Sequence, residues 1–341
     1  MVYFEKRLNG RQTTFTILTP WKCVQPCWYS IMYYPLSTGG QPRFGGIDEK
    51  MQLAFECGQP SFPRDFPGTQ SGWAHELVAR RKREEDWKRR PKSKRVNWSQ
   101  VYLGNGKKGE VGRGWACDWE RLSIEPSTDT VQTNQGDESS ADKNKNDASE
   151  SSRSAPPAAH DFSELVHVTA EQAETLLRSM SDSDASCNRS LATVRIDLLN
   201  RGVPQTCARV YRLPSSANGR KQWLDLHPRN QRQRLRKSKN AIPHVPKDAP
   251  DHIRRQRLAQ SLIDPKRADD EDYPPCPDED DLIGFVTTGN YNLGEGQGTG
   301  IASILLSRVR GAVRADPQIG RLCIIRNAGN GVARLGQWEI V

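Results

Sequence analysis

The stretch TPWKCVQPCWYSIMYYPLSTGGQPRFGGIDEKMQLAFECGQPSFPRDFPGTQSGW, residues 19–73, decides the fold of this chain. Prolines and glycines alternate in it with aromatic residues, namely Trp21, Trp28, Tyr29, Tyr33, Tyr34, Phe44, Phe55, Phe62 and Phe66. Aromatic side chains bury large apolar areas, and Pro and Gly fix the corners of the backbone. The stretch therefore predicts a rigid, irregular platform without catalytic chemistry. Its aromatic residues are expected to be chiefly core, with Trp21, Lys22 and Arg43 as the exceptions.

The composition favours a nucleic-acid partner. The 341 residues are 35% hydrophobic and 27% charged, so part of the chain is expected to be disordered. The net charge of +9 favours nucleic acid or an anionic membrane surface. The sequence contains no run of about 18 apolar residues, so no transmembrane helix is predicted. The first residues of the sequence lack the apolar core of a signal peptide. Eight cysteines without a disulfide framework suit a reducing compartment, so a membrane is not expected.

The residues around the platform predict a few regular elements. Residues 1–35 are expected to be extended, including TTFTIL and the aromatic run WYSIMYY. A short helix is predicted over DEKMQLAFECG, ended by Gly58. A long helix should run from Thr69 or Ser71 to Arg90, where Pro91 stops it. Its expected apolar stripe consists of Trp73, Leu77, Val78 and Trp87.

This helix and the loop after it carry most of the positive charge. Residues 73–113 hold thirteen Lys or Arg against five Asp or Glu. Such an excess indicates an RNA or DNA backbone surface, where cations release counterions from phosphates and Trp87 or Trp98 could stack on bases. The alternative is a solvated helix face balanced by Glu84, Glu85 and Asp86. The loop contains the turn GNGKKG, and VGRGWACDWERL follows as a predicted strand or turn.

Two later segments are predicted to be disordered. Residues 125–161 carry eight acidic and three basic residues and almost nothing to bury, which indicates an acidic, Ser-rich linker. Residues 214–281 form a second insertion, basic over 227–257 and acidic over 264–281. In it, RNQRQRLRKSKN with RRQR after it is either an RNA-binding or nuclear-import patch, or a solvated insertion neutralised by its acidic neighbour. Both interpretations stay open.

The remaining segments, 162–213 and 282–341, predict an α+β module. LVHV is a short predicted strand, and TAEQAETLLRSM a helix whose capping box is Thr169 with Gln172. LATVRIDLL alternates as a half-buried strand does, and TCARVYRL predicts a second strand after the turn NRGVPQ. The last 60 residues are rich in strands, with a hairpin turn at Asn-Ala-Gly-Asn-Gly.

For three further sequence patterns, a structural explanation is favoured over a functional one. Glycines alternate at Gly294, Gly296, Gly298 and Gly300 without a phosphate-loop or dinucleotide spacing, which favours a turn. Cys23 and Cys27 lack a matching ligand pair for zinc, so buried thiols are favoured and no metal site is expected. The carboxylates Asp65, Asp118 and Glu120 have Arg64, Arg113 and Arg121 beside them, which favours structural ion pairs. No nucleophile-base pair can be drawn, so no catalytic residue is assigned.

The opening stretch resembles a known family. PWKCVQPCWYSIMYYPLSTGGQPRFGG, followed by QLAFECGQPSFPRDFPGT and, after the basic helix, GRGWACDWERL, is similar to the POPLD domain in the largest protein subunit of eukaryotic ribonuclease P and ribonuclease MRP, in its form from filamentous fungi. LIGFVTTGNYNLGEGQGTGIA resembles the closing strands of that subunit and of glycine-cleavage T-proteins (aminomethyltransferases). The family subunit is much longer, so the chain is expected to be its C-terminal portion.

The resemblance implies a fold and a domain plan. The fold expected is α+β, with T-protein-like barrel or sheet elements, an irregular POPLD segment and two disordered insertions. Residues 1–124 would be the POPLD region with its basic helix and loop, and 125–161 the linker. Residues 162–213 and 282–341 would form the T-protein-like module, which 214–281 interrupts.

The resemblance also implies a function without catalysis by this chain. It implies a scaffold subunit of an RNA-based endoribonuclease that removes the 5′ leader of precursor tRNA and processes precursor ribosomal RNA in the nucleus and nucleolus. Its partners would be ribonuclease P RNA, MRP RNA and other protein subunits, with precursor tRNA met indirectly and no cofactor. The residues expected to contact RNA are Arg80, Arg81, Lys82, Arg83, Lys88, Arg89, Arg90, Lys92, Lys94, Arg95, Lys107, Lys108 and Arg113.

Two alternatives from other classes remain. A folate-dependent aminomethyltransferase would follow from the T-protein-like ending, although no residue here can be assigned as its catalytic acid. A protein-interaction scaffold would use its basic patches only for assembly or nuclear import, and it would have no RNA affinity.

Overall fold

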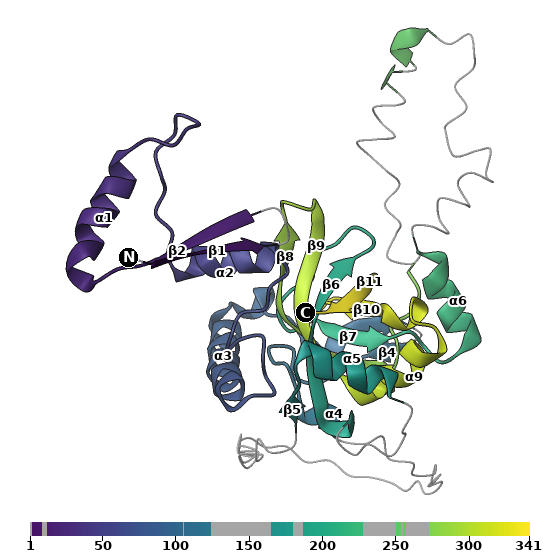
Figure 1. Ribbon diagram of the computed structural model, residues 1–341. Helices are drawn as coiled ribbons and strands as arrows, with labels where there is room; N and C mark the ends of the chain where they lie inside the picture. The colour runs from purple at the N-terminus through teal and green to yellow at the C-terminus, as the bar shows by residue number, and fades with distance from the viewer. Residues whose placement is uncertain are drawn as a thin grey trace, which may run out of the picture.

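A computed structural model describes residues 2–8, 12–104, 106–123, 165–179, 187–227, 250–253, 255–256 and 273–341. Its centre is a closed barrel of six antiparallel strands (Figure 1). These are β6 (Ser190–Leu198), β7 (Arg209–Arg212), β8 (Leu282–Asn292), β9 (Gln297–Leu305), β10 (Leu322–Arg326) and β11 (Ala333–Ile340). Around the barrel the order is β6, β9, β8, β7, β10 and β11, and β11 pairs with β6 to close it. The short strand β5 (Val166–His167) joins β6 in parallel.

Both faces of the barrel strands are buried, because different segments pack against each face. One apolar cluster continues from the strands onto α5 (Ala170–Arg178) and α9 (Leu306–Ala315). The other continues onto Trp119 and onto Trp223 of α6 (Ala217–Asp225). The strand β6 was expected to be half-buried, but most of it is buried since it lies between β9 and β11 with cover on both faces.

Local signals place several elements as expected. The helix α5 begins with the predicted capping box, in which Thr169 Oγ1 accepts from the backbone N–H of Gln172 and the Gln172 side chain accepts from that of Thr169. The hairpin of β10 and β11 turns through Gly329 at a φ of 76°. Gly294 and Gly296 lie in the turn between β8 and β9, where Gly296 has a φ of 69°. Gly298 and Gly300 lie on β9, and a β-carbon at Gly298 would be 2.2 Å from the Gly202 carbonyl oxygen, so the series combines a hairpin turn with a close backbone approach.

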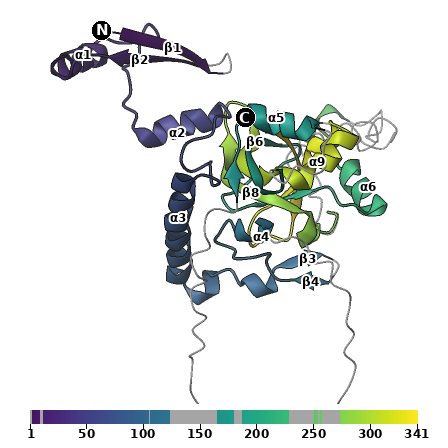
Figure 2. The same ribbon diagram turned by 60° about the horizontal axis from the view of Figure 1, so that its bottom comes forward.

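The N-terminal third wraps one side of the barrel and extends beyond it (Figures 1 and 2). Its elements are β1 (Val2–Leu8), β2 (Gln12–Leu18), α1 (Trp21–Tyr33), α2 (Ile47–Glu56), α3 (Gln70–Arg89), β3 (Tyr102–Gly104), β4 (Lys107–Lys108) and α4 (Glu120–Ser123). The helix α2 ends at Glu56, and the predicted stop Gly58 follows its C-cap residue with a φ of 69°. Two expectations were wrong: residues 21–33 form a helix where extended structure was predicted, and α4 occupies the end of a predicted strand or turn.

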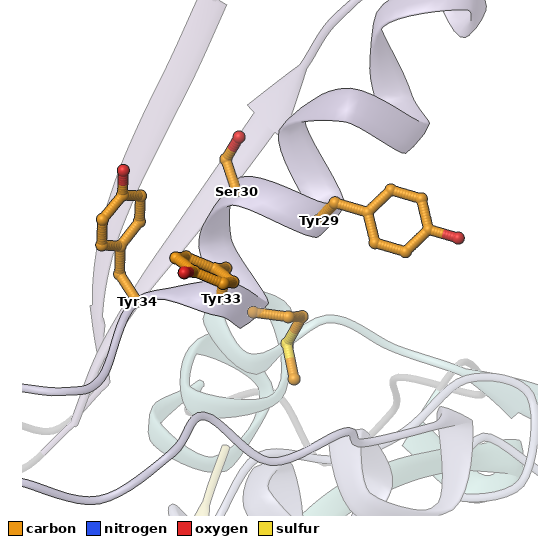
Figure 3. A pocket seen from close by; sticks show the side chains of 5 residues that line it. Tyr29, Ser30, Tyr33 and Tyr34 are labelled. Carbon is orange, nitrogen blue, oxygen red and sulfur yellow. The ribbon is translucent and has the colours of Figure 1, made fainter.

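The aromatic residues of the platform are mostly exposed, which corrects the prediction that they form a core. Phe55 is 4% exposed, but Tyr33 is 78%, Phe44 69% and Tyr34 66% exposed, and Trp21, an expected exception, is 87% exposed. Figure 3 shows the side chains of Tyr33 and Tyr34 at the end of α1. Figure 2 shows α1 and the β1–β2 hairpin standing apart from the barrel, so barrel residues do not cover them. The irregular segment after α2 is the part of the platform that packs against the barrel.

The predicted insertions are only partly described. The range 214–281 was too wide at both ends, because α6 lies within it and buries Trp223. Near its other end, the backbone N–H of Cys276 donates to the carbonyl of Leu103. Residues 125–161 and the basic runs 229–240 and 254–257 lie outside the described residues, apart from 255–256, so those predictions remain as stated.

The Phe-Pro-Arg-Asp-Phe-Pro segment fastens the platform to the barrel. Asp65 is 1% exposed, and its Oδ1 accepts hydrogen bonds from the hydroxyls of Thr287 at 2.6 Å and Thr288 at 2.7 Å on β8. The hydroxyl of Thr193 on β6 donates to the backbone carbonyl of Asp65. The ion pair of Asp65 with Arg64, at 3.6 Å, is secondary to these contacts. Residues 60–73 are therefore tied to the sheet through polar groups that water does not reach.

A second buried contact joins the loop before α4 to the barrel. The Glu110 side chain is fully buried between Arg209 of β7 and Arg326 of β10. Arg209 Nε lies 3.1 Å from Glu110 Oε1, and Arg326 Nη1 donates to Glu110 Oε2 at 2.9 Å. Burial raises the pKa of Glu110, but the hydrogen bond from Arg326 and the two positive charges outweigh it and leave the pKa below its ordinary value. The carboxylate therefore stays charged at neutral pH and neutralises two buried guanidinium groups.

Among the cysteines whose side chains the structure describes, four are buried, as expected for structural thiols: Cys57, Cys117, Cys207 and Cys323. The Sγ atoms of Cys117 and Cys207 lie 3.6 Å apart, so the two thiols pack where the loop before α4 meets the barrel. Cys23 and Cys27 are on α1 and are not buried, so for these two the expected burial was wrong.

Gly72, at the start of α3, provides a test of the close packing between α3 and the segment before it. A β-carbon there would lie 1.9 Å from the Phe66 carbonyl oxygen. Gly72→Ala should therefore lower the free energy of unfolding by about 3 kcal/mol, measured by urea denaturation. Gly311→Ala is the matched control, because nothing lies within 4 Å of its β-carbon in α9, and it should stabilise by about 0.5–1 kcal/mol. Equal effects of the two substitutions would contradict this close approach.

His167 provides a test by pH. It lies on β5 against the Phe66 ring, and its Nε2 is 2.8 Å from the Thr193 hydroxyl. Burial lowers the pKa of His167 from 6.5 to about 4. Because the unfolded chain binds this proton more tightly, its stability contribution is complete above pH 6.5 and is lost as the pH falls towards 4. Between pH 7.5 and 4.5 the loss should be about 2 kcal/mol. In urea titrations, the free energy of unfolding of His167→Gln should fall less over this pH interval than that of the wild type. An equal fall would contradict the lowered pKa of His167.

Candidate nucleic-acid interface

The basic surface is built on α3, whose ends follow from its sequence. Thr69 caps the helix, since its Oγ1 accepts from the backbone N–H of Gly72 at 3.1 Å. The helix ends at Arg89, and Pro91 cannot continue it. Both predicted ends are confirmed within a residue. The helix lies alongside the barrel (Figure 2), so one face packs against the chain and the other meets solvent.

The face of α3 that packs inward combines Trp73 and Trp87 of the predicted apolar stripe with charged side chains. Its positions follow helical spacing, namely Trp73, Glu76, Arg80, Arg83 and Trp87. Val78, which was predicted to be in the stripe, is 67% exposed. The two arginines point inward because the loop before α4 offers them carbonyl oxygens, while Glu120 of α4 and Glu76 of α3 offer them carboxylates.

Arg80 and Arg83 clamp that loop to α3. Arg80 is 7% exposed and donates to Glu120 Oε1 and to the Cys117 carbonyl, both at 2.7 Å. Arg83 donates to the Trp115 carbonyl at 2.7 Å and to Glu76 Oε1 at 2.6 Å. Burial alone would lower the pKa of Arg80, but its hydrogen bond and ion pair with Glu120 raise it. These two guanidinium groups hold the loop before α4 against α3.

Two more of the thirteen predicted contact residues also serve the fold. Arg113 Nε donates to Asp118 Oδ1 at 2.8 Å, which confirms the predicted structural pair. Arg95 lies over the Trp87 ring at 5.0 Å and donates to the carbonyl oxygens of Lys88 and Arg90. Glu120 was expected to pair with its neighbours, and it contacts Arg80 and Arg113.

The other nine predicted cations are exposed, namely Arg81, Lys82, Lys88, Arg89, Arg90, Lys92, Lys94, Lys107 and Lys108. Three of them have exposed carboxylate partners: Glu84 for Lys88, Asp86 for Arg89 and Asp278 for Lys107. For the other six, no ion pair is found within the part of the chain that the structure describes.

These exposed cations concentrate at one end of the helix. Residues 88–94 hold five cations and no carboxylate, and the negative end of the helix dipole favours cations there. In Figure 2 this end of α3 and the β3–β4 hairpin lie along the same lower edge of the molecule. We call Lys88, Arg89, Arg90, Lys92, Lys94, Lys107 and Lys108 the basic edge. Arg81 and Lys82 lie earlier on the same helix.

Three tryptophans support the basic edge from beneath. Trp87 stacks on Trp115 with ring centres 5.1 Å apart, and Trp98 lies 6.1 Å from Trp115. The Trp87 indole N–H donates to the Val96 carbonyl. Trp87 or Trp98 was expected to be able to stack on bases, and the two rings are half-buried against one another. Their packing fixes the backbone that carries the basic edge.

Sequence reasoning missed the role of Glu76 and the division of the cations. A count of charges over 73–113 treats all thirteen Lys and Arg residues alike. Helical spacing places Arg80 and Arg83 on a different face of α3 from Arg81 and Lys82. The spacing of Glu76 with Arg80 and Arg83 was the available signal.

Within the described residues, no group of three or more His, Cys, Asp or Glu side chains is arranged to hold a metal ion. None of the described helices is both long enough and apolar enough to span a membrane.

Comparisons with known proteins match two parts of the chain. Residues 14–119 match the model of the POPLD (NUC188) domain, and residues 190–341 match that of the POP1 C-terminal domain. The first match contains α1, α3 and the basic edge, and the second contains the barrel.

Curated relatives match nearly the whole chain. The chain is 28% identical over 338 residues to the ribonucleases P/MRP protein subunit pop1 of Schizosaccharomyces pombe, covering 99% of this chain and 33% of that protein. It is 26% identical over 370 aligned residues to the ribonucleases P/MRP protein subunit POP1 of Saccharomyces cerevisiae, covering 98% of this chain and 37% of that protein. The chain thus spans about a third of the length of these relatives.

Proposed function

The chain belongs to the family that carries the POPLD and POP1 C-terminal domains, and on this premise we propose that it is a non-catalytic, RNA-binding scaffold subunit of ribonuclease P and ribonuclease MRP. Its partners would be the RNA subunits and the other protein subunits of these particles. The RNA would perform the phosphodiester chemistry on precursor tRNA and precursor ribosomal RNA. The proposal includes a nuclear and nucleolar location and a T-protein-like scaffold, for which the closed barrel is consistent support.

The observation that best supports the proposal is that α3 carries two kinds of cation, buried ones and exposed ones. Buried guanidinium groups hold the helix and the loop before α4 in place, and the basic edge presents further cations to solvent from that rigid support. Exposed cations without carboxylate partners are the groups that replace counterions on a phosphate backbone. Such contacts position an RNA and read little of its sequence.

The first test is binding of the purified chain to ribonuclease P RNA across a salt series. If about six phosphates are neutralised, the logarithm of the association constant should fall with the logarithm of the salt concentration with a slope near −4 to −5. Filter binding between 50 and 300 mM salt measures this slope. An unrelated RNA of equal length should give a similar slope. A protein-interaction scaffold without RNA affinity would show no retention at the lowest salt, and that outcome would overturn the proposal.

A further inference from the structure

Three exposed carboxylates lie beside the basic edge. They belong to Asp278, Glu279 and Asp280, which we call the acidic turn, just before β8. The turn is the described end of the acidic run 264–281, which holds nine Asp or Glu against two Lys or Arg. From the sequence, the neighbouring basic run 227–257 was the expected partner of these charges. The structure places the acidic turn against cations of the POPLD region instead.

The backbone on both sides of the acidic turn is fastened to the fold. Before the turn, the backbone N–H of Cys276 donates to the Leu103 carbonyl of β3 at 3.0 Å. After the turn, Asp281 is 9% exposed, and its Oδ1 accepts from Arg212 Nε of β7 at 2.9 Å. These two contacts hold the acidic turn next to the β3–β4 hairpin, which carries part of the basic edge. Its position is therefore set by the fold and does not depend on the ion pairs that its own carboxylates make.

Two of the carboxylates occupy cations at the surface. Asp278 pairs with Lys107 of the basic edge, and Glu279 pairs with Arg121 of α4. Because the two acidic residues are adjacent, they bring the two cations to one place on the surface. All four side chains are 42–62% exposed. Exposed pairs of this kind contribute little to folding stability, so an incoming phosphate can replace either carboxylate.

The same carboxylates oppose an RNA backbone along the hairpin. While the pairs are closed, the two cations do not neutralise phosphates, and a phosphate that approaches them meets three like charges. This repulsion acts over roughly 8–10 Å at ordinary salt concentrations, so it is confined to phosphates close to the hairpin. We infer that the acidic turn competes with RNA phosphates for Lys107 and Arg121 and thereby weakens RNA binding by this chain. The inference rests on the proposed function, and it adds an internal competitor to the basic edge.

The test measures RNA binding after the acidic turn is made neutral. The variant of the full chain carries Asp278→Asn, Glu279→Gln and Asp280→Asn, and Asp281 is kept because it holds the backbone. In filter binding at about 100 mM salt, it should bind ribonuclease P RNA about 5- to 10-fold more tightly than the wild type. The salt slope should steepen by about 1–2, since up to two more cations engage phosphates. The gain should shrink towards about 300 mM salt as the charges are screened.

Two further variants link the gain to this contact. A charge-matched control carries Asp48→Asn, Glu171→Gln and Glu339→Gln, which are exposed on α2, α5 and β11, and its affinity should change less than about 2-fold. Adding Lys107→Gln and Arg121→Gln to the neutral turn should remove most of the gain, because the cations released by the turn are then absent. Urea denaturation should give nearly the wild-type midpoint for the neutral turn, since its three side chains are exposed.

The outcomes separate this inference from the proposed function. If the wild type and the neutral-turn variant bind RNA equally, or if the charge-matched control gains as much, the inference is overturned and the proposed function stands. A gain that persists without Lys107 and Arg121 would also overturn it. If neither the wild type nor the variant retains RNA at the lowest salt, both the inference and the proposed function fail.

Discussion

Replacing Glu110 by alanine should lower the free energy of unfolding by about 3–5 kcal/mol. The substitution leaves Arg209 and Arg326, both 0% exposed, without the carboxylate that neutralises them. It also removes the acceptor for the backbone N–H of Gly329, which donates to Glu110 Oε2 at 2.8 Å. Two buried cations and an orphaned donor make this the most costly single substitution that we expect. Urea denaturation at pH 7 measures the change.

The control for this prediction is Glu85→Ala on α3. Glu85 is exposed, so its loss should change the free energy of unfolding by less than about 0.5 kcal/mol. If Glu110→Ala stayed within 1 kcal/mol of the wild type, the buried contact between the loop before α4 and the barrel would be wrong. The same result would remove the support for treating the POPLD region and the barrel as one packed unit.

Removing the unpaired cations should weaken RNA binding at least about 100-fold near 100 mM salt and reduce the salt slope by about 4. The variant replaces Arg81, Lys82, Arg90, Lys92, Lys94 and Lys108 by glutamine. These side chains lie outside the internal clamp, so the variant should unfold at nearly the wild-type urea concentration. Filter binding across a salt series measures both affinity and slope.

A charge-matched control separates the surface from net charge. It replaces six exposed cations elsewhere, namely Lys50, Arg178, Arg189, Arg201, Lys221 and Arg255. Both variants lose six positive charges, so a general electrostatic effect would weaken them equally. We expect the control to lose only a few-fold in affinity. Equal losses would show that the basic edge is not the surface that contacts RNA.

The sequence was a good guide where local signals decide the structure. The capping residue Thr69 and the stop at Pro91 bounded α3, and Thr169 with Gln172 marked the start of α5. Such caps act through hydrogen bonds within one turn, so no distant contact is needed to predict them. Strand positions in the barrel followed from apolar runs. The barrel closes because β6 pairs with β11, about 140 residues later in the chain. No local sequence signal predicts a pairing over that distance.

The helix α1 could not be predicted from periodicity. Its aromatic and aliphatic side chains occur on all sides, and Pro26 interrupts it. A one-sided apolar stripe arises when a helix packs on its own domain, and α1 does not do so here. For the same reason the platform was mistaken for a core, because sequence composition records apolar residues but not which polypeptide covers them.

The candidate interface was predicted as a region, and only partly by residue. The excess of cations over 73–113 was evident, but its inward and outward members alternate along α3. Arg80 was placed on the RNA-binding surface, and its guanidinium is instead enclosed by Glu120 and the Cys117 carbonyl. Tertiary partners 37 and 40 residues away in the sequence decided this.

The most direct test of the proposed function is ultraviolet cross-linking of RNA to protein in the assembled particle, followed by peptide mapping. The account predicts RNA adducts on peptides from 81–94 and 106–108, and no adduct at Arg80 or Arg83. Adducts confined to α1 or to the barrel would contradict it, as would a particle in which this chain cross-links only to protein.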